Sequence, residues 1–382
     1  MRFTKLFAAV LCSLAALAAS GQNLRDEIAA NPGKSGGVYY VYTYDNPVLT
    51  PAPKGYKPFY ISHYGRHGSR WLLHDSEYDE VMAVFRAADA ANAFTERGRE
   101  VYGRVKRVYD DGIDRGGDLS PLGAEQHREI AARMYRNFPE VFRSGAVVDA
   151  QATLVVRCVL SMAAFCERLK ELNPRLEVSR TAGRRTTRYL NFYSKPTNPT
   201  LSREYLDFID KGGWQEEYER IGDRFVRPGR LMSELFADGE FVRTIDAQKL
   251  MKGLFYFAAD MQNVGLGISF YDLFTTDELY GLNVYDNYKY YVIRGPSPLN
   301  RRFPQYYAKA LLEDFLTRAD RAVEGGAVSA DLRFGRQPDD VRVAAAVRGV
   351  RRRGERSRKD RPSVALVQDY ADGGQYPAGF LP

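Results

Sequence analysis

A short strand-like segment that runs directly into a basic, glycine-containing loop is the feature that most constrains the fold of this chain. Residues 58–63 are aromatic and β-branched, as is typical of a strand, and the loop at 64–70 (Tyr-Gly-Arg-His-Gly-Ser-Arg) follows without a spacer. In open α/β sheets, ligands bind beyond the carboxyl ends of strands. We therefore expect residues 64–70 to form a ligand-binding loop at the edge of a sheet.

The remaining helix and strand patterns predict an α/β fold. Helical patterns cover 77–110, 120–138 with Ser120 as the expected cap, 156–172 and 303–324, and short strands are expected at 147–148 and 332–334. A further stretch, 200–283, is rich in helix formers, Tyr and Phe. We predict a three-layer sandwich core formed by about 38–175 and 303–335, with an inserted helical cap lobe at about 176–302.

The first residues have the pattern of an export signal. Arg2 and Lys5 flank the start of an apolar run from Leu6 to Ala19, which is about 14 residues long and too short to cross a bilayer comfortably. Small residues follow at 19–21. We predict a signal peptide at 1–21, a periplasmic or secreted mature chain, and no integral membrane segment.

The net charge of +7 is unevenly distributed along the chain. Residues 336–382 carry nine Arg and one Lys against six acidic residues, whereas the net charge of residues 22–335 is only +1. Together with the export signal, this near-neutral body argues against nucleic acid as a partner.

The residue types in the loop suit attack on a phosphomonoester. Such a group carries two negative charges, and the planar guanidinium of Arg66 or Arg70 can bind two phosphate oxygens at once. His67 can act as a nucleophile, and Gly68 lets the backbone approach the ligand. From the residues alone, His67 as a metal ligand or a surface residue, and a chance Arg-His-Gly, stay open as alternatives.

Residues 64–70 resemble the active loop of the histidine phosphatase superfamily, and the last arginine of the loop is typical of its acid-phosphatase and phytase branch. The longer segment 62–70 is most similar to the multiple inositol polyphosphate phosphatases. Residues 119–123 resemble that group's Leu-Thr-Pro-x-Gly segment, and 153–157 resemble its Ser-Thr-x-x-x-Arg helix entry. The resemblance covers about 38–335.

The resemblance implies a role for four residues. The nucleophile would be His67, and the residues that bind the phosphoryl group and stabilise its transition state would be Arg66, Arg70 and Arg157. It also implies a small phosphorylated substrate such as an inositol polyphosphate, and neither a metal nor an organic cofactor. For Arg157, a salt bridge on a helix surface is the alternative. We expect His63 and His127 to be structural or pocket-lining.

The chain departs from the family pattern after the strand expected at 332–334. The family has His-Asp or His-Ala-Glu there, and the acid protonates the leaving oxygen. Here Gly335 is followed by Arg-Gln-Pro-Asp-Asp, and all four histidines lie at or before position 127. Back-translation in a frame shifted by one base permits family-like segments at both ends of the tail. We infer a reading-frame slip near Gly335 that makes 336–382 an aberrant basic tail; a genuine disordered tail is the alternative.

The sequence thus predicts a phosphomonoesterase that hydrolyses inositol polyphosphates through a phosphohistidine intermediate, with activity impaired by loss of the C-terminal acid. Two other functions stay open. One is a broad-specificity acid phosphatase. The other is a non-catalytic binder of phosphorylated ligands, since three arginines would still hold phosphate without a proton donor.

Overall fold

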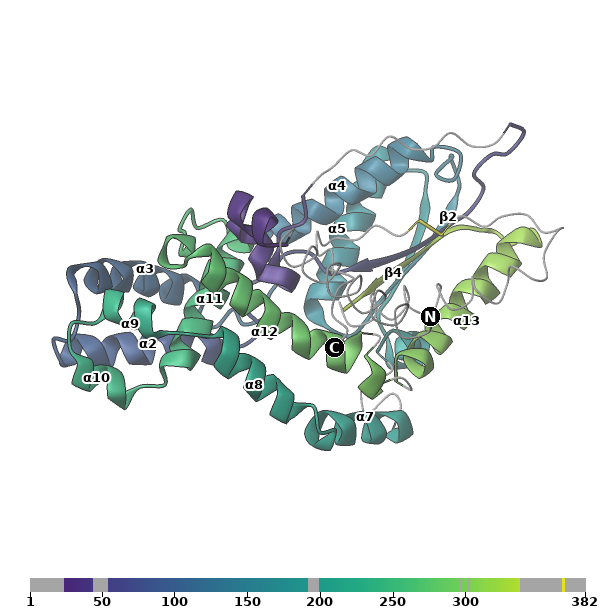
Figure 1. Cartoon of the computed structure of the whole chain (residues 1–382). Coiled ribbons are helices and arrows are strands. Elements are labelled where there is room, and N and C mark those ends of the chain that lie inside the picture. Colours follow the sequence, from purple (N-terminus) through teal and green to yellow (C-terminus); the bar gives the residue numbers. More distant parts are fainter. Residues whose placement is uncertain are drawn as a thin grey trace, which may run out of the picture.

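The computed structural model describes residues 24–43, 54–191, 199–295, 297–300, 303–336 and 366–367. The predicted signal peptide and most of the predicted aberrant tail lie outside these residues. Figure 1 shows a sheet with its flanking helices at one end of the molecule and a lobe of helices at the other. Within the described ranges, no helix combines the length and the apolar character needed to cross a membrane.

A five-stranded parallel sheet forms the centre of the α/β part. Its strands are β1 (Ile61–Arg66), β2 (Val147–Ala152), β3 (Glu177–Thr181), β4 (Val328–Gly335) and β5 (Leu366–Val367), in the order β3-β2-β4-β1-β5. Parallel strands need crossover connections, which place helices on the faces of the sheet. Arg66 of β1 pairs with Gly335 of β4, so these two strands end at the same edge.

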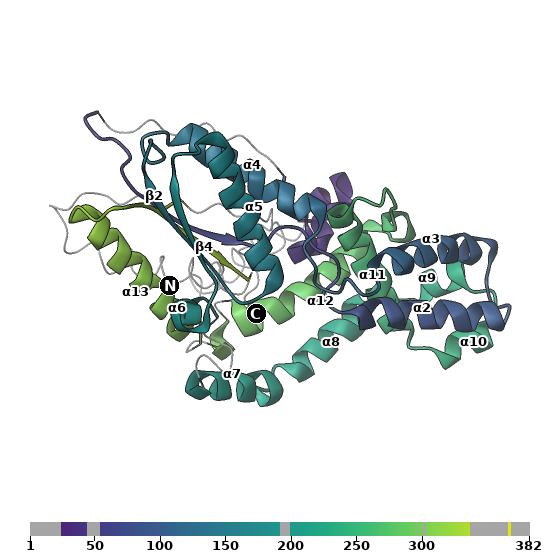
Figure 2. The ribbon, with the colours of Figure 1, turned by 180° about the vertical axis from the view of Figure 1, so that it is seen from behind.

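Helices cover both faces of the sheet. One face carries α4 (Pro121–Asn137) and α5 (Val156–Leu172), and α13 (Phe303–Val323) lies on the other face (Figures 1 and 2). The α/β fold with a three-layer sandwich, as predicted from the sequence, is therefore confirmed.

The side chains of β4 alternate between these two layers. Leu332 and Phe334 join the hydrophobic cluster beneath α4 and α5. Asp331 points to the other face, where its carboxylate pairs with Arg318 of α13 at 2.6 Å. Because side chains alternate with period two, one face of β4 contacts an apolar layer and the other face contacts a buried ionic layer.

The helical lobe is built around a second hydrophobic cluster. Its helices are α2 (Asp75–Ala90), α3 (Glu96–Gly112), α8 (Gln215–Phe225), α9 (Gly229–Leu235), α10 (Gly239–Thr244), α11 (Ala247–Val264) and α12 (Thr276–Arg294). The other helical segments are η1 (Pro32–Tyr39), α6 (Arg184–Thr187), η2 (Arg188–Asn191), α7 (Pro199–Lys211), η3 (Tyr271–Leu273) and η4 (Pro298–Asn300). Of these, η1 packs on α11 and α12.

The division between core and lobe differs from the one expected at 38–175 and 176–302. The helical pattern at 77–110 is two helices, α2 and α3, separated by a turn in which Asn92 has a left-handed φ of 52°. Both helices share the hydrophobic cluster of the lobe, and β3 is an edge strand of the sheet. Helical periodicity indicates that one face is buried, but it does not indicate which partner buries it.

The starts of α4 and α5 agree with the sequence. The Ser120 hydroxyl accepts the amide of Gly123 at 3.1 Å, and Pro121 occupies the first helical position, as expected for a capped helix. α5 has the predicted bounds. These two helices matter for the site because both begin beside the loop that follows β1.

Candidate active site

Backbone contacts hold the loop after β1 at the carboxyl edge of the sheet. The His67 amide donates to the Gly335 carbonyl oxygen at 3.2 Å, and the Gly68 amide donates to Ser161 Oγ of α5 at 3.1 Å. A Cβ atom on Gly68 would lie 2.2 Å from the carbonyl oxygen of Gly123 in α4. The loop is therefore fixed against β4, α5 and the first turn of α4, and position 68 has room only for glycine.

Ser69 connects this loop to the helical lobe. Its amide donates to Gln126 Oε1 at 2.8 Å, and its hydroxyl donates to Asn263 Oδ1 of α11 at 2.7 Å. Asn263 Nδ2 donates in turn to the Tyr39 carbonyl oxygen at 2.8 Å. The loop, the lobe and η1 consequently meet at one place, although they are far apart in the sequence.

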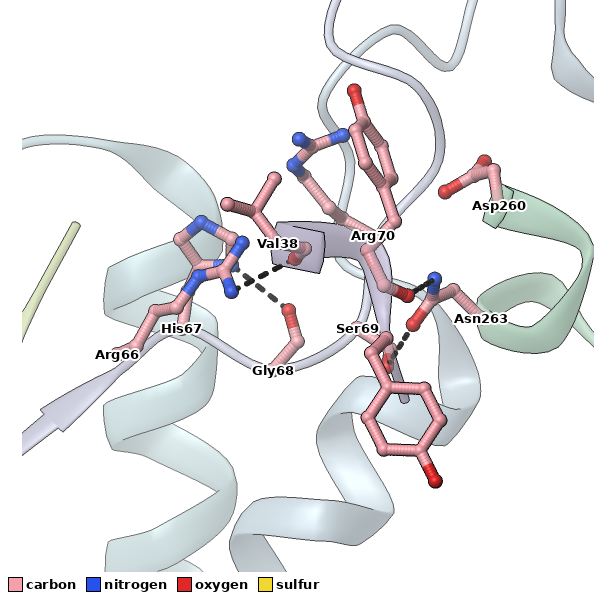
Figure 3. A pocket seen from close by; sticks show the side chains of 10 residues that line it. Val38, Arg66, His67, Gly68, Ser69, Arg70, Asp260 and Asn263 are labelled. Atoms are coloured by element: carbon pink, nitrogen blue, oxygen red, sulfur yellow. Dashed lines mark hydrogen bonds between the residues drawn. The ribbon is translucent and has the colours of Figure 1, made fainter. Parts of the chain in front are cut away.

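A small cavity, partly open to solvent, lies where these segments meet. Its lining residues are Val38, Tyr39, Tyr40, Arg66, His67, Gly68, Ser69, Arg70, Asp260 and Asn263. In Figure 3, Arg66 and His67 lie on one side of the cavity, and Asp260 and Asn263 lie on the other. The predicted residues of the loop therefore share one cavity with residues of the lobe.

His67 lines this cavity and is buried, with only 5% of its surface exposed. Its Nδ1 lies 2.8 Å from the carbonyl oxygen of Gly68. A carbonyl oxygen can only accept, so Nδ1 carries the proton of the neutral ring and Nε2 keeps its lone pair. Burial, and then the positive charges of Arg66, Arg157 and Arg70, hold the pKa of His67 well below its ordinary value. The imidazole is therefore a neutral base with one nitrogen available for attack.

The three predicted arginines surround this imidazole but are anchored differently. Arg66 donates from Nη1 to the Val38 carbonyl oxygen at 3.1 Å, and Arg157 donates from Nη1 to the Gly117 carbonyl oxygen at 3.2 Å. Arg157 is half-buried and lies outside the cavity lining, although its charge reaches His67. Their positive charges make the site suited to a multiply charged anion.

Arg70 is held by one backbone contact and one aromatic ring. Its Nη1 donates to the Trp71 carbonyl oxygen at 2.6 Å, and its guanidinium carbon lies 5.0 Å from the centroid of the Tyr39 ring. Among the described residues it forms no ion pair, so its charge is not neutralised by a carboxylate. Arg70 is thus a preorganised cation on the wall of the cavity.

The sequence did not indicate the cavity residues that come from η1 and from the helical lobe. The most important of these is Asp260. This residue is fully buried in α11, and burial raises the pKa of its carboxyl to about 8, opposed by the charge of Arg70. The available signal was one acidic residue in the apolar run around Ala258, Ala259 and Met261, a position where a charge is costly.

His63 and His127 lie beneath the loop and do not line the cavity. The His63 ring stacks on Phe165 with centroids 5.6 Å apart, and His127 meets the edge of Phe334 at 5.6 Å. They are part of the core that supports the loop. In the part of the chain that the structure describes, no three His, Cys, Asp or Glu side chains are grouped as a metal site requires.

No protein-family model matches the chain, and no curated protein matches it. Several solved structures do. The multiple inositol polyphosphate phosphatase of Bifidobacterium longum in complex with inositol hexasulfate is 18% identical over 82% of this chain and 80% of that chain, with a TM-score of 0.70. Its apo form is 19% identical over 82% and 79%, with a TM-score of 0.69. A phytase from D. castellii is 14% identical over 83% and 68%, with a TM-score of 0.54.

These likenesses establish the fold. The chain has the fold of the histidine phosphatases, as the loop motif led us to expect. The solved structures that share this fold with the chain include a multiple inositol polyphosphate phosphatase and a phytase. At these identities the likeness concerns the fold, so the chemistry of this chain has to be argued from its own residues.

Proposed function

We propose that this chain is a phosphomonoesterase that hydrolyses inositol polyphosphates through a phosphohistidine intermediate. The observation that carries the proposal is the state of His67: a buried, neutral imidazole whose Nδ1 is engaged and whose Nε2 keeps its lone pair, within reach of the positive charges of three arginines. A neutral nucleophile beside fixed positive charge is what attack on a phosphate dianion requires.

The residues suggest the following sequence of steps. Arg66, Arg70 and Arg157 bind the phosphoryl oxygens and neutralise their charge. His67 Nε2 then attacks phosphorus in line as the bond to the leaving oxygen breaks, and that oxygen takes up a proton. Water attacks the phosphohistidine in the second half, which releases inorganic phosphate and restores the neutral ring.

Two features support an inositol polyphosphate as the substrate. The cavity wall carries two arginines, Arg66 and Arg70, which suit a ligand with phosphate groups. The B. longum structure to which this chain is similar was solved in complex with inositol hexasulfate, an inositol ring that carries only anionic substituents. The export signal predicted at 1–21 supports a periplasmic or secreted location for this activity.

The residue that follows β4 supports the proposal that activity is impaired. Gly335 accepts a hydrogen bond from the His67 amide, so the chain leaves β4 beside the nucleophile. Arg336 stands there instead of the family's histidine. Loss of a positioned proton donor costs about 10²–10⁴ in rate. The same observation favours a second candidate, a binder of phosphorylated ligands that turns them over slowly or not at all.

Phosphate release from phytate by the wild-type chain and by His67→Ala tests the proposal. The wild-type chain should release phosphate, and His67→Ala should reduce the rate to background. Equal rates would refute the proposed mechanism. Phytate binding by the wild-type chain without any release would favour the binder.

A further inference from the structure

Asp260 is a buried acid in the cavity that the steps above do not use. Its side chain is 0% exposed, and among the described residues neither carboxyl oxygen has a hydrogen-bond partner. The Leu72 amide lies near it but donates to Tyr78 Oη at 3.0 Å. Buried polar groups are rarely left without a partner. An acid that lines a cavity and lacks a protein partner is poised to bind a ligand there.

Asp260 and His67 lie on different sides of the cavity, and this arrangement determines which atom of a bound phosphomonoester Asp260 can reach. Figure 3 shows the two side chains on opposite sides of the cavity, with Arg70 between them. In phosphoryl transfer, the attacking atom and the leaving oxygen lie on opposite sides of phosphorus. A phosphoryl group held by Arg70 and attacked from His67 would therefore direct its leaving oxygen toward Asp260.

The surroundings of Asp260 keep it protonated. Burial raises the pKa of its carboxyl to about 8, and Glu77 of α2 adds to the rise, while Arg70 and the Leu72 amide oppose it. Tyr39 of η1 also faces it, and burial keeps the pKa of that phenol above its ordinary value. The acid is therefore neutral at pH 7 and below, and it can donate a proton.

We infer that Asp260 is the proton donor to the leaving oxygen in this chain, whose strand β4 is not followed by an acid of the family type. The inference rests on the proposed phosphatase function. Asp260 would then supply the proton for the residual turnover of this chain, in which Arg336 follows Gly335.

The step balances as follows. His67 Nε2 forms a bond to phosphorus, the bond from phosphorus to the leaving oxygen breaks, and the Asp260 proton moves to that oxygen. The product is an alcohol, a phosphohistidine and an Asp260 carboxylate, which Arg70 stabilises. In the second half, the carboxylate takes a proton from water as its oxygen attacks phosphorus, and inorganic phosphate leaves with both side chains restored.

Leaving-group dependence tests the inference. The full-length chain and its Asp260→Asn variant are compared on glycerol phosphate, whose alkoxide must be protonated, and on p-nitrophenyl phosphate, whose phenolate leaves without a proton. Asp260→Asn should lower kcat/KM, which reports the steps up to departure of the leaving group, by about 10²–10³-fold on glycerol phosphate and by less than about threefold on p-nitrophenyl phosphate. Activity on p-nitrophenyl phosphate also reports that the variant is folded. The wild-type kcat/KM on glycerol phosphate should fall above about pH 8, and this limb should be absent from the variant.

Asp286→Asn is the matched control. Asp286 is also a buried acid of the lobe with a raised pKa, but it accepts a hydrogen bond from Tyr256 at 3.0 Å and does not line the cavity. It should leave the ratio of the two kcat/KM values unchanged. Equal losses on both substrates, or no loss on either, would overturn the role of Asp260. His67→Ala tests the proposed function separately, because it should abolish turnover of both substrates.

Discussion

The amide of His67 donates a hydrogen bond of 3.2 Å to the carbonyl oxygen of Gly335, which joins the loop after β1 to the last residue of β4. The two residues lie side by side because β1 and β4 are parallel and in register at Arg66 and Gly335. Whatever follows Gly335 therefore leaves the sheet beside the proposed nucleophile. The identity of the residues after 335 consequently bears on the chemistry directly.

The first prediction concerns these residues. A chain in which the segment from 336 onward is replaced by the product of the frame shifted by one base should turn over phytate about 10²–10⁴-fold faster than the chain as written, because a positioned acid is restored. Initial rates of phosphate release measure this. The same replacement made together with His67→Ala should stay inactive, and an unchanged rate in the single replacement would count against the frame slip.

The second prediction concerns the close approach of the loop and α4. Gly68→Ala places a Cβ atom 2.2 Å from the Gly123 carbonyl oxygen, so the loop has to shift. Overpacking of this kind costs about 1–3 kcal/mol of stability. We expect phosphate release to be lost with a lowered unfolding midpoint. Gly103→Ala in α3, where a Cβ atom meets nothing within 4 Å, should retain full activity and is the control.

The third prediction concerns the planar charge of Arg70. Arg70→Lys keeps the positive charge but loses the planar guanidinium that can bind two phosphate oxygens at once. The kcat/KM on phytate should therefore fall by about 10–10²-fold. Arg86→Lys is a matched control, because the Arg86 guanidinium also lies 5.0 Å from a tyrosine ring, that of Tyr109, away from the cavity. Steady-state kinetics measure both. Equal effects of the two substitutions would argue against a phosphate-binding role for Arg70.

The fourth prediction concerns the histidines beneath the loop. Burial lowers the pKa of His63 to about 4 and the pKa of His127 to about 3, below the ordinary value of 6.5. Below pH 6.5 these histidines are protonated in the unfolded chain but stay neutral in the folded chain. Their contribution to the free energy of unfolding is therefore full above pH 6.5 and is lost as the pH falls toward 4 and 3. Each histidine contributes a slope of at most about 1.4 kcal/mol per pH unit.

Urea unfolding of wild type and His127→Gln between pH 6.5 and 4 checks this slope. The variant should lose stability less steeply with falling pH than wild type does. Parallel slopes for wild type and His127→Gln would show that His127 does not contribute.

The sequence predicted those parts of the fold that depend on local chemistry. Ser120 and Pro121 carry the signals of a helix start, and α5 begins and ends where its apolar pattern does. β3 was missed because Glu177–Thr181 is an edge strand with mostly polar side chains and no apolar alternation. Its place in the sheet depends on pairing with β2, which a local pattern does not contain.

The residues of the candidate site also fall into two groups, those that a local motif indicates and those that only tertiary packing brings to the cavity. Residues 66–70 form one short motif, so their types and spacing alone were enough to indicate the loop. Tyr39 and Asp260 reach the cavity only through the packing of η1 and α11 against the loop, across separations of about 30 and 190 residues. Tertiary packing of this kind leaves no local signal beyond the acidic residue in an apolar run.

The central claim is that His67 becomes covalently phosphorylated, and rapid quenching with a radiolabelled phosphomonoester tests it most directly. The wild-type chain should carry a label that is stable in alkali and labile in acid, as expected of a phosphohistidine, and peptide mapping should place it on His67. His67→Ala should carry none. An unlabelled wild-type chain that still releases phosphate, or a label on any other residue, would contradict the account.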